Sequence, residues 1–109
     1  MVKIKVYSTK SGKAPFFDWQ EKLSVCIRAI VRTRLDRLGF GLFGDSKIIK
    51  GGEGIWELRI DTGPGYRIYF GKKGNVLVVL LVGGDKGSQE RDIARAKRYW
   101  LEYKELNDE

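Results

Sequence analysis

Two arginines are the residues of this sequence best suited to chemistry on an anion. Arg59 lies in the segment 56–60 and Arg67 in the segment 66–70, and a glycine-containing turn joins the two segments. Side chains in a strand alternate between the two faces of a sheet. If the segments form a hairpin centred on Gly63, Arg59 lies opposite Arg67 on one face. Two guanidinium groups on one face suit the binding of a phosphodiester.

The charge of this predicted pair allows two interpretations. Like charges directly opposed in an antiparallel pair, with Cβ atoms roughly 4.5–5.5 Å apart, destabilise the sheet, and a bound anion removes that cost. Alternatively, Glu57, which is opposite Tyr69 in this register, screens the arginines in the free protein. We favour the anion site, because one carboxylate cannot balance two arginines and a lysine. A slip of one residue would separate the arginines onto opposite faces.

The lysine is Lys86, which follows the apolar run 76–82. That run is typical of a central strand covered on both faces. Antiparallel pairing of the run with 66–70 returns the chain toward the arginines. We expect Lys86 to reach Arg67 only if Gly83 and Gly84 curl inward, which glycines do easily.

Composition limits the function classes. The 109 residues suit one domain, residues 1–109, and 21 basic against 14 acidic residues give a net charge of +7. This balance favours nucleic acid, an acidic protein or an anionic membrane surface as partner. The sequence has no histidine and one cysteine, so we expect no zinc site and no cofactor. No apolar run has the length of a membrane span and no signal-peptide pattern is present, so we expect a cytoplasmic protein with no membrane partner.

The remaining pattern predicts an α+β fold with a small, mostly antiparallel twisted sheet, two N-terminal helices packed on it and a C-terminal helix. The expected strands are 2–7, 47–50, 56–60, 66–70 and 76–82, and the expected helices are 15–23, 24–38 with Ser24 as cap, and one starting near Ser88. Cys26 falls in an apolar helical pattern and is expected in the core. In the last helix we expect Ala96 and Trp100 inside and Tyr103 outside.

Several motifs together resemble a known family. They are Trp56-Glu57-Leu58-Arg59, Gly63-Pro64-Gly65-Tyr66-Arg67 and Gly83-Gly84-Asp85-Lys86-Gly87-Ser88-Gln89, with Asp92-Ile93 and Ala96 after them and Pro15-Phe16 and Trp19 near the start. In this order they resemble the RelE/ParE superfamily of toxins from type II toxin–antitoxin systems. The resemblance is closest to the HigB-like branch of addiction module killer proteins.

The resemblance implies a RelE/ParE-like fold and a metal-independent endoribonuclease, or mRNA interferase, that cuts mRNA on the ribosome and inhibits translation. The 2′-hydroxyl of the substrate would attack the adjacent phosphate, leaving a cyclic phosphate and a free 5′-hydroxyl. By resemblance, Arg67 contacts the phosphate, Arg59 grips the same or a neighbouring phosphate, and Lys86 protonates or neutralises the leaving 5′-oxygen. The implied partners are mRNA, the ribosome and a cognate antitoxin of the helix-turn-helix type.

The general base stays open at this point. Lysine and arginine, with reference pKa values of about 10.4 and above about 12, are poor bases at neutral pH. Glu57 and Asp85 are carboxylate alternatives, and Tyr69 is a candidate for orienting the 2′-hydroxyl. The chain also departs from several ribonucleases of the family because it lacks histidine.

Two other functions are compatible with the resemblance or the charge. One is a ParE-type gyrase inhibitor, which needs no catalytic residues, although converging cations at a sheet edge argue against it. The other is a non-catalytic RNA-binding module that relies on phosphate contacts alone.

Overall fold

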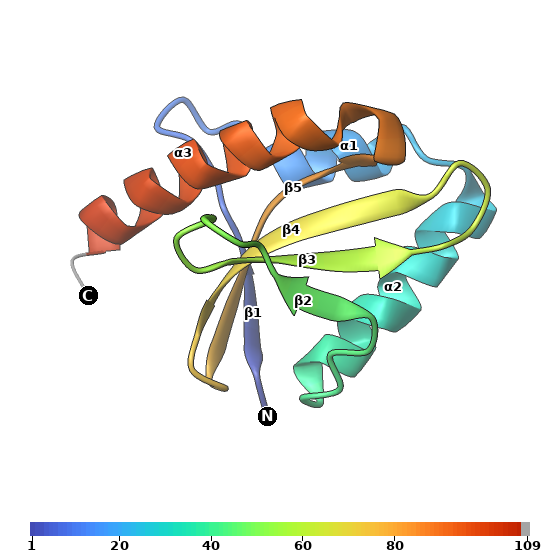
Figure 1. The fold of residues 1–109 in the computed structure, drawn as a ribbon, viewed down its shortest axis with the longest axis horizontal. Coiled ribbons are helices and arrows are strands. Elements are labelled where there is room, and N and C mark those ends of the chain that lie inside the picture. The colour runs from blue at the N-terminus through green and yellow to red at the C-terminus, as the bar shows by residue number, and fades with distance from the viewer. Residues whose placement is uncertain (108–109) are drawn as a thin grey trace.

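A five-stranded sheet forms the middle layer of the protein, described here by a computed structural model for residues 1–107 (Figure 1). Its spatial order is β1 (Lys3–Val6), β5 (Leu77–Asp85), β4 (Tyr66–Lys73), β3 (Ile55–Ile60) and β2 (Ser46–Ile48). Only the β1–β5 pair is parallel, and the other three neighbouring pairs are antiparallel. The predicted mostly antiparallel sheet is confirmed.

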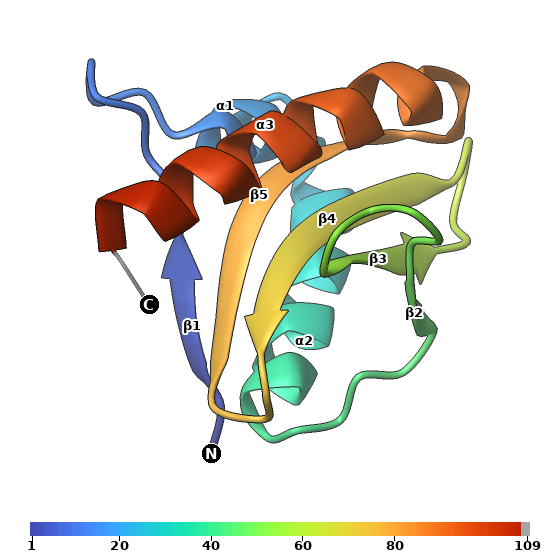
Figure 2. The same cartoon turned by 60° about the vertical axis from the view of Figure 1, so that its left-hand side comes forward.

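Helices cover both faces of the sheet. The helices α1 (Pro15–Glu21) and α2 (Val25–Gly39) pack on one side, here called the α1/α2 face, and α3 (Gln89–Asn107) crosses the other side, the α3 face (Figures 1 and 2). Ser24 caps α2, as expected, because its hydroxyl accepts a hydrogen bond from the backbone N–H of Ile27 at 3.3 Å. None of the helices within residues 1–107 has the length and apolar character that crossing a membrane requires.

The sheet separates two apolar cores. On the α1/α2 face, Ile68 and Phe70 of β4 pack with Phe16 of α1 and neighbouring residues. On the α3 face, Tyr69 packs with Trp100 of α3 and its neighbours. Both faces of β4 and β5 are therefore covered, which explains the nearly continuous apolar sequence of β5.

Two core predictions were wrong. Cys26 is exposed because it lies in the first turn of α2, on the side away from the stripe that packs on the sheet. Tyr103 is buried because its ring stacks on Trp100, with centroids 5.6 Å apart, and extends the core under α3. Ala96 and Trp100 are buried, as predicted.

The register of the central hairpin is the predicted one. Arg59 pairs with Arg67 and Glu57 with Tyr69. Gly63 and Gly65 adopt positive φ angles of 57° and 84° in the connecting turn, a conformation that glycine tolerates best. The alternation of apolar and polar residues, together with turn glycines, was therefore sufficient to place both arginines on one face.

A bulge in β5 sets the faces at the end of that strand. Tyr69 pairs with Val82, whereas Phe70 pairs with Leu80, so one extra residue of β5 is accommodated between them. Beyond the bulge, Gly83 shares the α1/α2 face with Ile68, where Trp19 packs against it, and Gly84 shares the α3 face with Arg67. The predicted inward curl of Gly83 and Gly84 is wrong, because both glycines continue β5 as extended strand.

Glycine substitutions provide a test of this packing. A Cβ added at Gly71 would overlap the indole of Trp100, so we expect Gly71→Ala to lower the free energy of unfolding by about 1–3 kcal/mol. Gly39→Ala is the matched control: the new Cβ would meet only Ile4 Cδ1, at 3.8 Å, and should raise stability by about 0.4–1 kcal/mol. Urea unfolding of both variants measures the difference. Equal stability of the two variants would contradict the close contact of α3 with the sheet.

Candidate functional site

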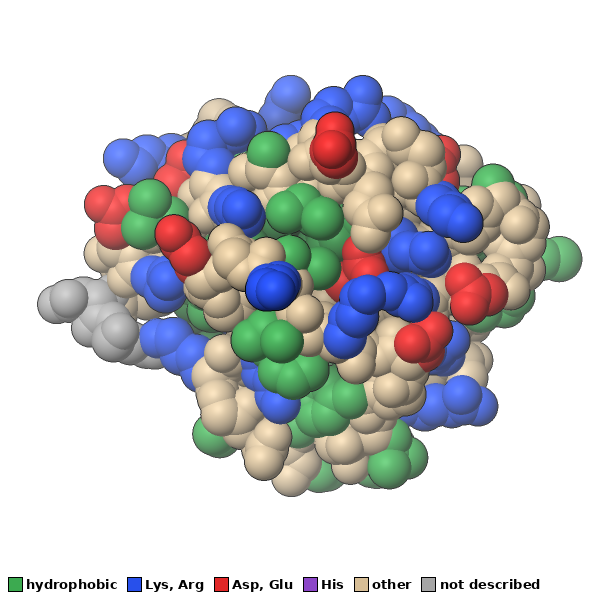
Figure 3. All heavy atoms as spheres, in the orientation of Figure 1, with side chains coloured by type: hydrophobic (Ala, Val, Ile, Leu, Met, Phe, Trp, Pro, Cys, Tyr) green, Lys and Arg blue, Asp and Glu red, His purple; other side chains and the backbone are tan. Residues whose placement is uncertain are grey.

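The two opposed arginines lie on the α3 face near the end of the β3–β4 hairpin. Basic and acidic side chains are mixed over the surface seen in Figure 3, so charge density by itself does not mark a site there. The two arginines differ in environment: Arg67 is only 7 % exposed, whereas the Arg59 side chain is 34 % exposed. A cation as buried as Arg67 requires compensation by hydrogen bonds or opposite charge.

Arg67 is incompletely compensated. Its Nη1 donates a hydrogen bond to the backbone carbonyl of Tyr66 at 3.1 Å and lies 3.6 Å from Oδ1 of Asp61. Asp61 is 75 % exposed, so this ion pair is weak in water. The buried Nε of Arg67 has no hydrogen-bond partner among the described residues. Arg67 therefore keeps a donor available for an added acceptor.

Glu57 is fully buried and both of its carboxylate oxygens are engaged. Oε1 accepts a hydrogen bond from Nε of Arg59 at 3.2 Å, and Oε2 accepts one from Nε2 of Gln89 at 2.6 Å. Asp61 also contacts Arg67, so two carboxylates face the two arginines. Gln89 ends the motif 83–89, and the sequence did not indicate its contact with Glu57. Its position in the first turn of α3 was the available signal.

Tyr69 adds a second unpartnered donor. Its hydroxyl is buried beside Glu57 and makes no hydrogen bond of normal geometry among the described residues, although it interacts with the Glu57 carboxylate at longer range. Burial and then the Glu57 carboxylate raise the pKa of Tyr69, so the hydroxyl stays protonated at neutral pH. Tyr69 and Arg67 are two residues apart on the same face of β4, where each unmade hydrogen bond costs about 1–3 kcal/mol. An oxyanion bound between them would satisfy both donors.

Lys86 lies beside Arg67 without any inward curl of the glycines. Its backbone N–H donates to the carbonyl of Gly65 at 3.0 Å. Its Cβ and Nη1 of Arg67 each lie 3.7 Å from the position that a Cβ on Gly65 would occupy. The bulge in β5 accounts for this, since it advances the strand by one residue against β4 and sets Asp85 opposite Tyr66.

Asp85 has a structural task at the same edge. Its carboxylate Oδ1 accepts hydrogen bonds from the backbone N–H groups of Gly87 at 2.8 Å and Ser88 at 3.1 Å. It thereby caps the short 3₁₀ helix η1 (Lys86–Ser88) that leads into α3. The site thus brings together Arg59, Arg67, Tyr69 and Glu57 with Lys86 at the rim, while Asp85 holds the loop.

We predict that Tyr69→Phe leaves the free energy of unfolding at neutral pH unchanged or raises it by up to about 1 kcal/mol, because the lost hydroxyl makes no hydrogen bond in the described structure. The raised pKa also predicts a pH effect. The neutral hydroxyl stabilises the folded state below the unfolded tyrosine pKa of about 10, and this stability is lost as the pH rises toward the folded value.

The check is urea unfolding of parent and variant from pH 8 to pH 11. The parent should lose more stability above about pH 10 than Tyr69→Phe. Part of the loss should persist in the variant, because burial also raises the pKa of Tyr7. A variant much less stable than the parent at pH 7 would show that the Tyr69 hydroxyl has a partner.

No group of three or more histidine, cysteine, aspartate or glutamate side chains within residues 1–107 is arranged to hold a metal ion. No protein-family model matches the chain. The chain is 48 % identical over 83 residues to an uncharacterized protein of Haemophilus influenzae, a match that covers 75 % of this chain and 82 % of that protein.

Proposed function

We propose that this chain, which belongs to the same family as the uncharacterized Haemophilus influenzae protein, is a toxin of a type II toxin–antitoxin system. Because that relative is uncharacterized, the proposal rests on the residues of the site. Within this proposal the chain is a member of the RelE/ParE superfamily, in the HigB-like branch. Its activity is metal-independent cleavage of mRNA on the ribosome, in the cytoplasm.

The observation that supports this proposal most strongly is a pair of buried donors, Arg67 Nε and the Tyr69 hydroxyl, which make no hydrogen bond of normal geometry within residues 1–107 and lie next to a second arginine. The opposed arginines repel each other, the exposed Asp61 offsets this repulsion only weakly at Arg67, and an anion with several acceptor oxygens relieves the rest. A phosphodiester has the required charge and oxygens. Lys86 at the rim adds a cation on the solvent side.

The proposed reaction is an internal transfer at phosphorus. The 2′-oxygen of the substrate bonds to phosphorus and the bond from phosphorus to the 5′-oxygen breaks, which leaves a 2′,3′-cyclic phosphate and a 5′-hydroxyl. Arg67 and Arg59 stabilise the negative charge that builds on the phosphoryl oxygens, and Lys86 gives a proton to the leaving 5′-oxygen. The proton of the 2′-hydroxyl goes to a base.

The lack of a clearly available general base favours a second candidate function, a non-catalytic RNA-binding module. Both oxygens of Glu57 are hydrogen-bonded, and Asp85 caps η1, so neither carboxylate named from the sequence is free in this structure. Asp61 is also paired, with Arg67, but this pair is long at 3.6 Å and its carboxylate is 75 % exposed, so Asp61 is the carboxylate most available for this role. If Asp61 does not act as base, the site suits a non-catalytic RNA-binding module.

The proposed partner besides RNA is an antitoxin of the helix-turn-helix type. With a net charge of +7, the toxin favours association with an acidic segment of that protein. Such a segment would compete with RNA for Arg59, Arg67 and Lys86.

The test is induced expression followed by mapping of mRNA ends, with the parent compared with Arg67→Ala and Lys86→Ala. The proposal expects new 5′-hydroxyl ends in the parent and their loss in Arg67→Ala. Growth arrest with intact mRNA and lost DNA supercoiling would instead identify a gyrase inhibitor. RNA binding without cleavage would identify the non-catalytic module.

A further inference from the structure

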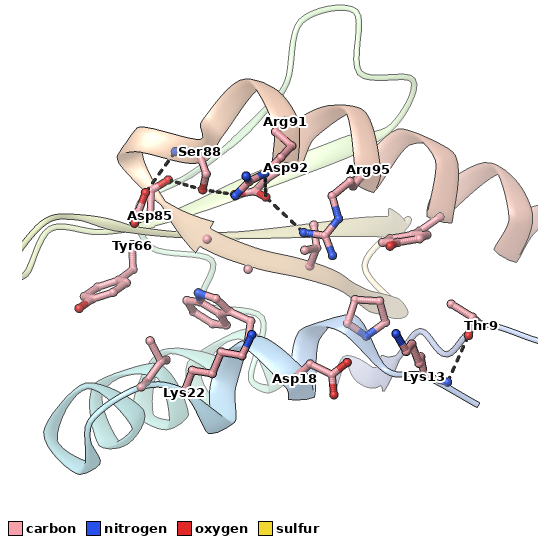
Figure 4. A pocket seen from close by; sticks show the side chains of 17 residues that line it. Thr9, Lys13, Asp18, Lys22, Tyr66, Asp85, Ser88, Arg91, Asp92 and Arg95 are labelled. Carbon is pink, nitrogen blue, oxygen red and sulfur yellow. Dashed lines mark hydrogen bonds and ion pairs between the residues drawn. The ribbon is translucent and has the colours of Figure 1, made fainter. Parts of the chain in front are cut away.

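A second cavity lies at the free edge of β5, away from the paired arginines (Figure 4). The parallel strand β1 pairs with β5 only as far as Leu80, while β5 continues to Asp85. Beyond Leu80, helices α1 and α3 stand on either side of the uncovered edge, and they enclose a pocket of about 500 Å³. This volume is within the range of small-molecule sites, about 300–1,000 Å³.

The walls of this edge pocket combine cations with aromatic rings. Lys13 and Lys22 come from the α1 side, and Arg91 and Arg95 come from α3 on the opposite side (Figure 4). The aromatic side chains that line it are Trp19, Tyr66 and Tyr99. Cations beside aromatic rings are the combination with which proteins bind single-stranded nucleic acid, since phosphates need charge and bases need a surface for stacking.

The acidic residues of the pocket are largely neutralised by contacts within the protein. Asp92 is buried, accepts a hydrogen bond from the Ser88 hydroxyl, and has its Oδ1 3.5 Å from Nη1 of Arg95 and 3.9 Å from Nε of Arg91. Asp85 is occupied by the cap of η1. Asp18 remains to oppose the two lysines of the α1 wall. The pocket therefore keeps an excess of positive charge on that wall.

The edge pocket and the arginine site are neighbours along β4 and at the end of β5. Tyr66 and Arg67 are neighbours on β4, so their side chains point to opposite faces: Tyr66 lines the pocket and Arg67 lies in the site. Asp85 lines the pocket, and the next residue, Lys86, is bonded to Gly65 beside Arg67. The two sites are therefore one residue apart at two places, between Tyr66 and Arg67 on β4 and between Asp85 and Lys86 at the start of η1.

We propose that the edge pocket is a nucleotide subsite that receives the base and phosphate next to the phosphodiester held by Arg67. This inference rests on the proposed function, because it assumes single-stranded RNA as the ligand. The RNA strand passes the rim at Lys86, and one flanking nucleotide enters between α1 and α3. Its phosphate meets Lys13 and Lys22, and its base packs against Trp19 and Tyr66, since Tyr99 already stacks on Tyr7. Contacts in this pocket then contribute to the sequence preference of cleavage.

The test uses a short single-stranded RNA that carries 2′-O-methyl groups and cannot be cleaved by attack of its 2′-oxygen. Its affinity is measured by fluorescence anisotropy at several salt concentrations for the parent, Lys13→Gln/Lys22→Gln and the control Lys3→Gln/Lys5→Gln. The control removes the same charge from exposed positions of β1. Losing the contacts to this one phosphate should weaken binding and lower the slope of log affinity against log salt by about 0.7, whereas the control should change little.

A second measurement locates the ligand. Adding the same RNA to ¹⁵N-labelled parent protein should shift the amide signals of Gly83 and Gly84 and the indole signal of Trp19. Cleavage of unmodified RNA by Lys13→Gln/Lys22→Gln should continue with an altered distribution of cut sites.

The outcomes separate the two proposals. If the pocket variant binds and cleaves RNA like the parent while Arg67→Ala does not cleave, the subsite is overturned and the ribonuclease stands. If the parent neither binds nor cleaves RNA, both proposals are overturned. Saturation of the pocket signals by an acidic peptide, with no response to RNA, would also overturn the nucleotide subsite.

Discussion

Arg67→Ala is expected to slow RNA cleavage by about 10²–10³-fold, the loss typical of removing one preorganised donor from a developing oxyanion. Arg67 is buried, its Nε has no partner among the described residues, and it lies opposite Arg59. Removing it also removes the repulsion between two opposed cations, so the fold should persist. Single-turnover cleavage of an RNA oligonucleotide, together with urea unfolding, measures both effects.

Two further variants make this result specific. Arg67→Lys keeps the charge but loses the planar fork, so it should recover only part of the lost rate. Arg28→Ala removes an exposed arginine from α2, on the opposite side of the sheet, and should cleave like the parent. If Arg67→Ala cleaved at the parental rate while remaining folded, Arg67 would have no place in the reaction.

Glu57→Ala is expected to lower the free energy of unfolding by about 3 kcal/mol. The substitution leaves Arg59 without its ion-pair partner and Gln89 without its acceptor, and it opens a cavity under the start of α3. Arg59 is one-third exposed and regains some hydration, which keeps the loss at the low end of the range for broken buried pairs. For a chain of this size the melting temperature should fall by on the order of 10 °C.

Glu57→Gln separates a positioning role from a catalytic one. The amide keeps the size of the side chain and an acceptor oxygen but cannot take a proton at neutral pH. If Glu57 only positions Arg59 and α3, the variant should be more stable than Glu57→Ala and should still cleave RNA. Normal stability with abolished cleavage would identify Glu57 as the base, and Asp61→Asn would then cleave normally.

The arginine pair is the part of the site that local rules predict well. Side-chain alternation assigns Arg59 and Arg67 to faces, and a turn that requires positive φ at Gly63 and Gly65 fixes where the hairpin reverses. The Ser24 cap was predictable for the same reason, because a cap involves residues three positions apart. In each case the physical signal is contained in a few consecutive residues.

The surroundings of that pair were decided by contacts across the chain. Gln89 reaches Glu57 from 32 residues away because α3 packs on the sheet, and this contact engages one oxygen of the carboxylate that the sequence offered as a base. A bulge that no local pattern signalled, rather than flexible glycines, sets Lys86 next to Gly65 and near Arg67.

The sequence by itself determined the α+β class, the hairpin register and the identity of the cations, because strand alternation, turn glycines and helix caps act over short stretches. Only the tertiary structure decided which described donors lack a hydrogen-bond partner and which carboxylates are engaged. It also decided that a pocket forms where β5 extends beyond the end of β1. These properties depend on burial and on the meeting of distant elements. The side-chain types fix the available charges, and the packing decides which of them stay free to bind a ligand.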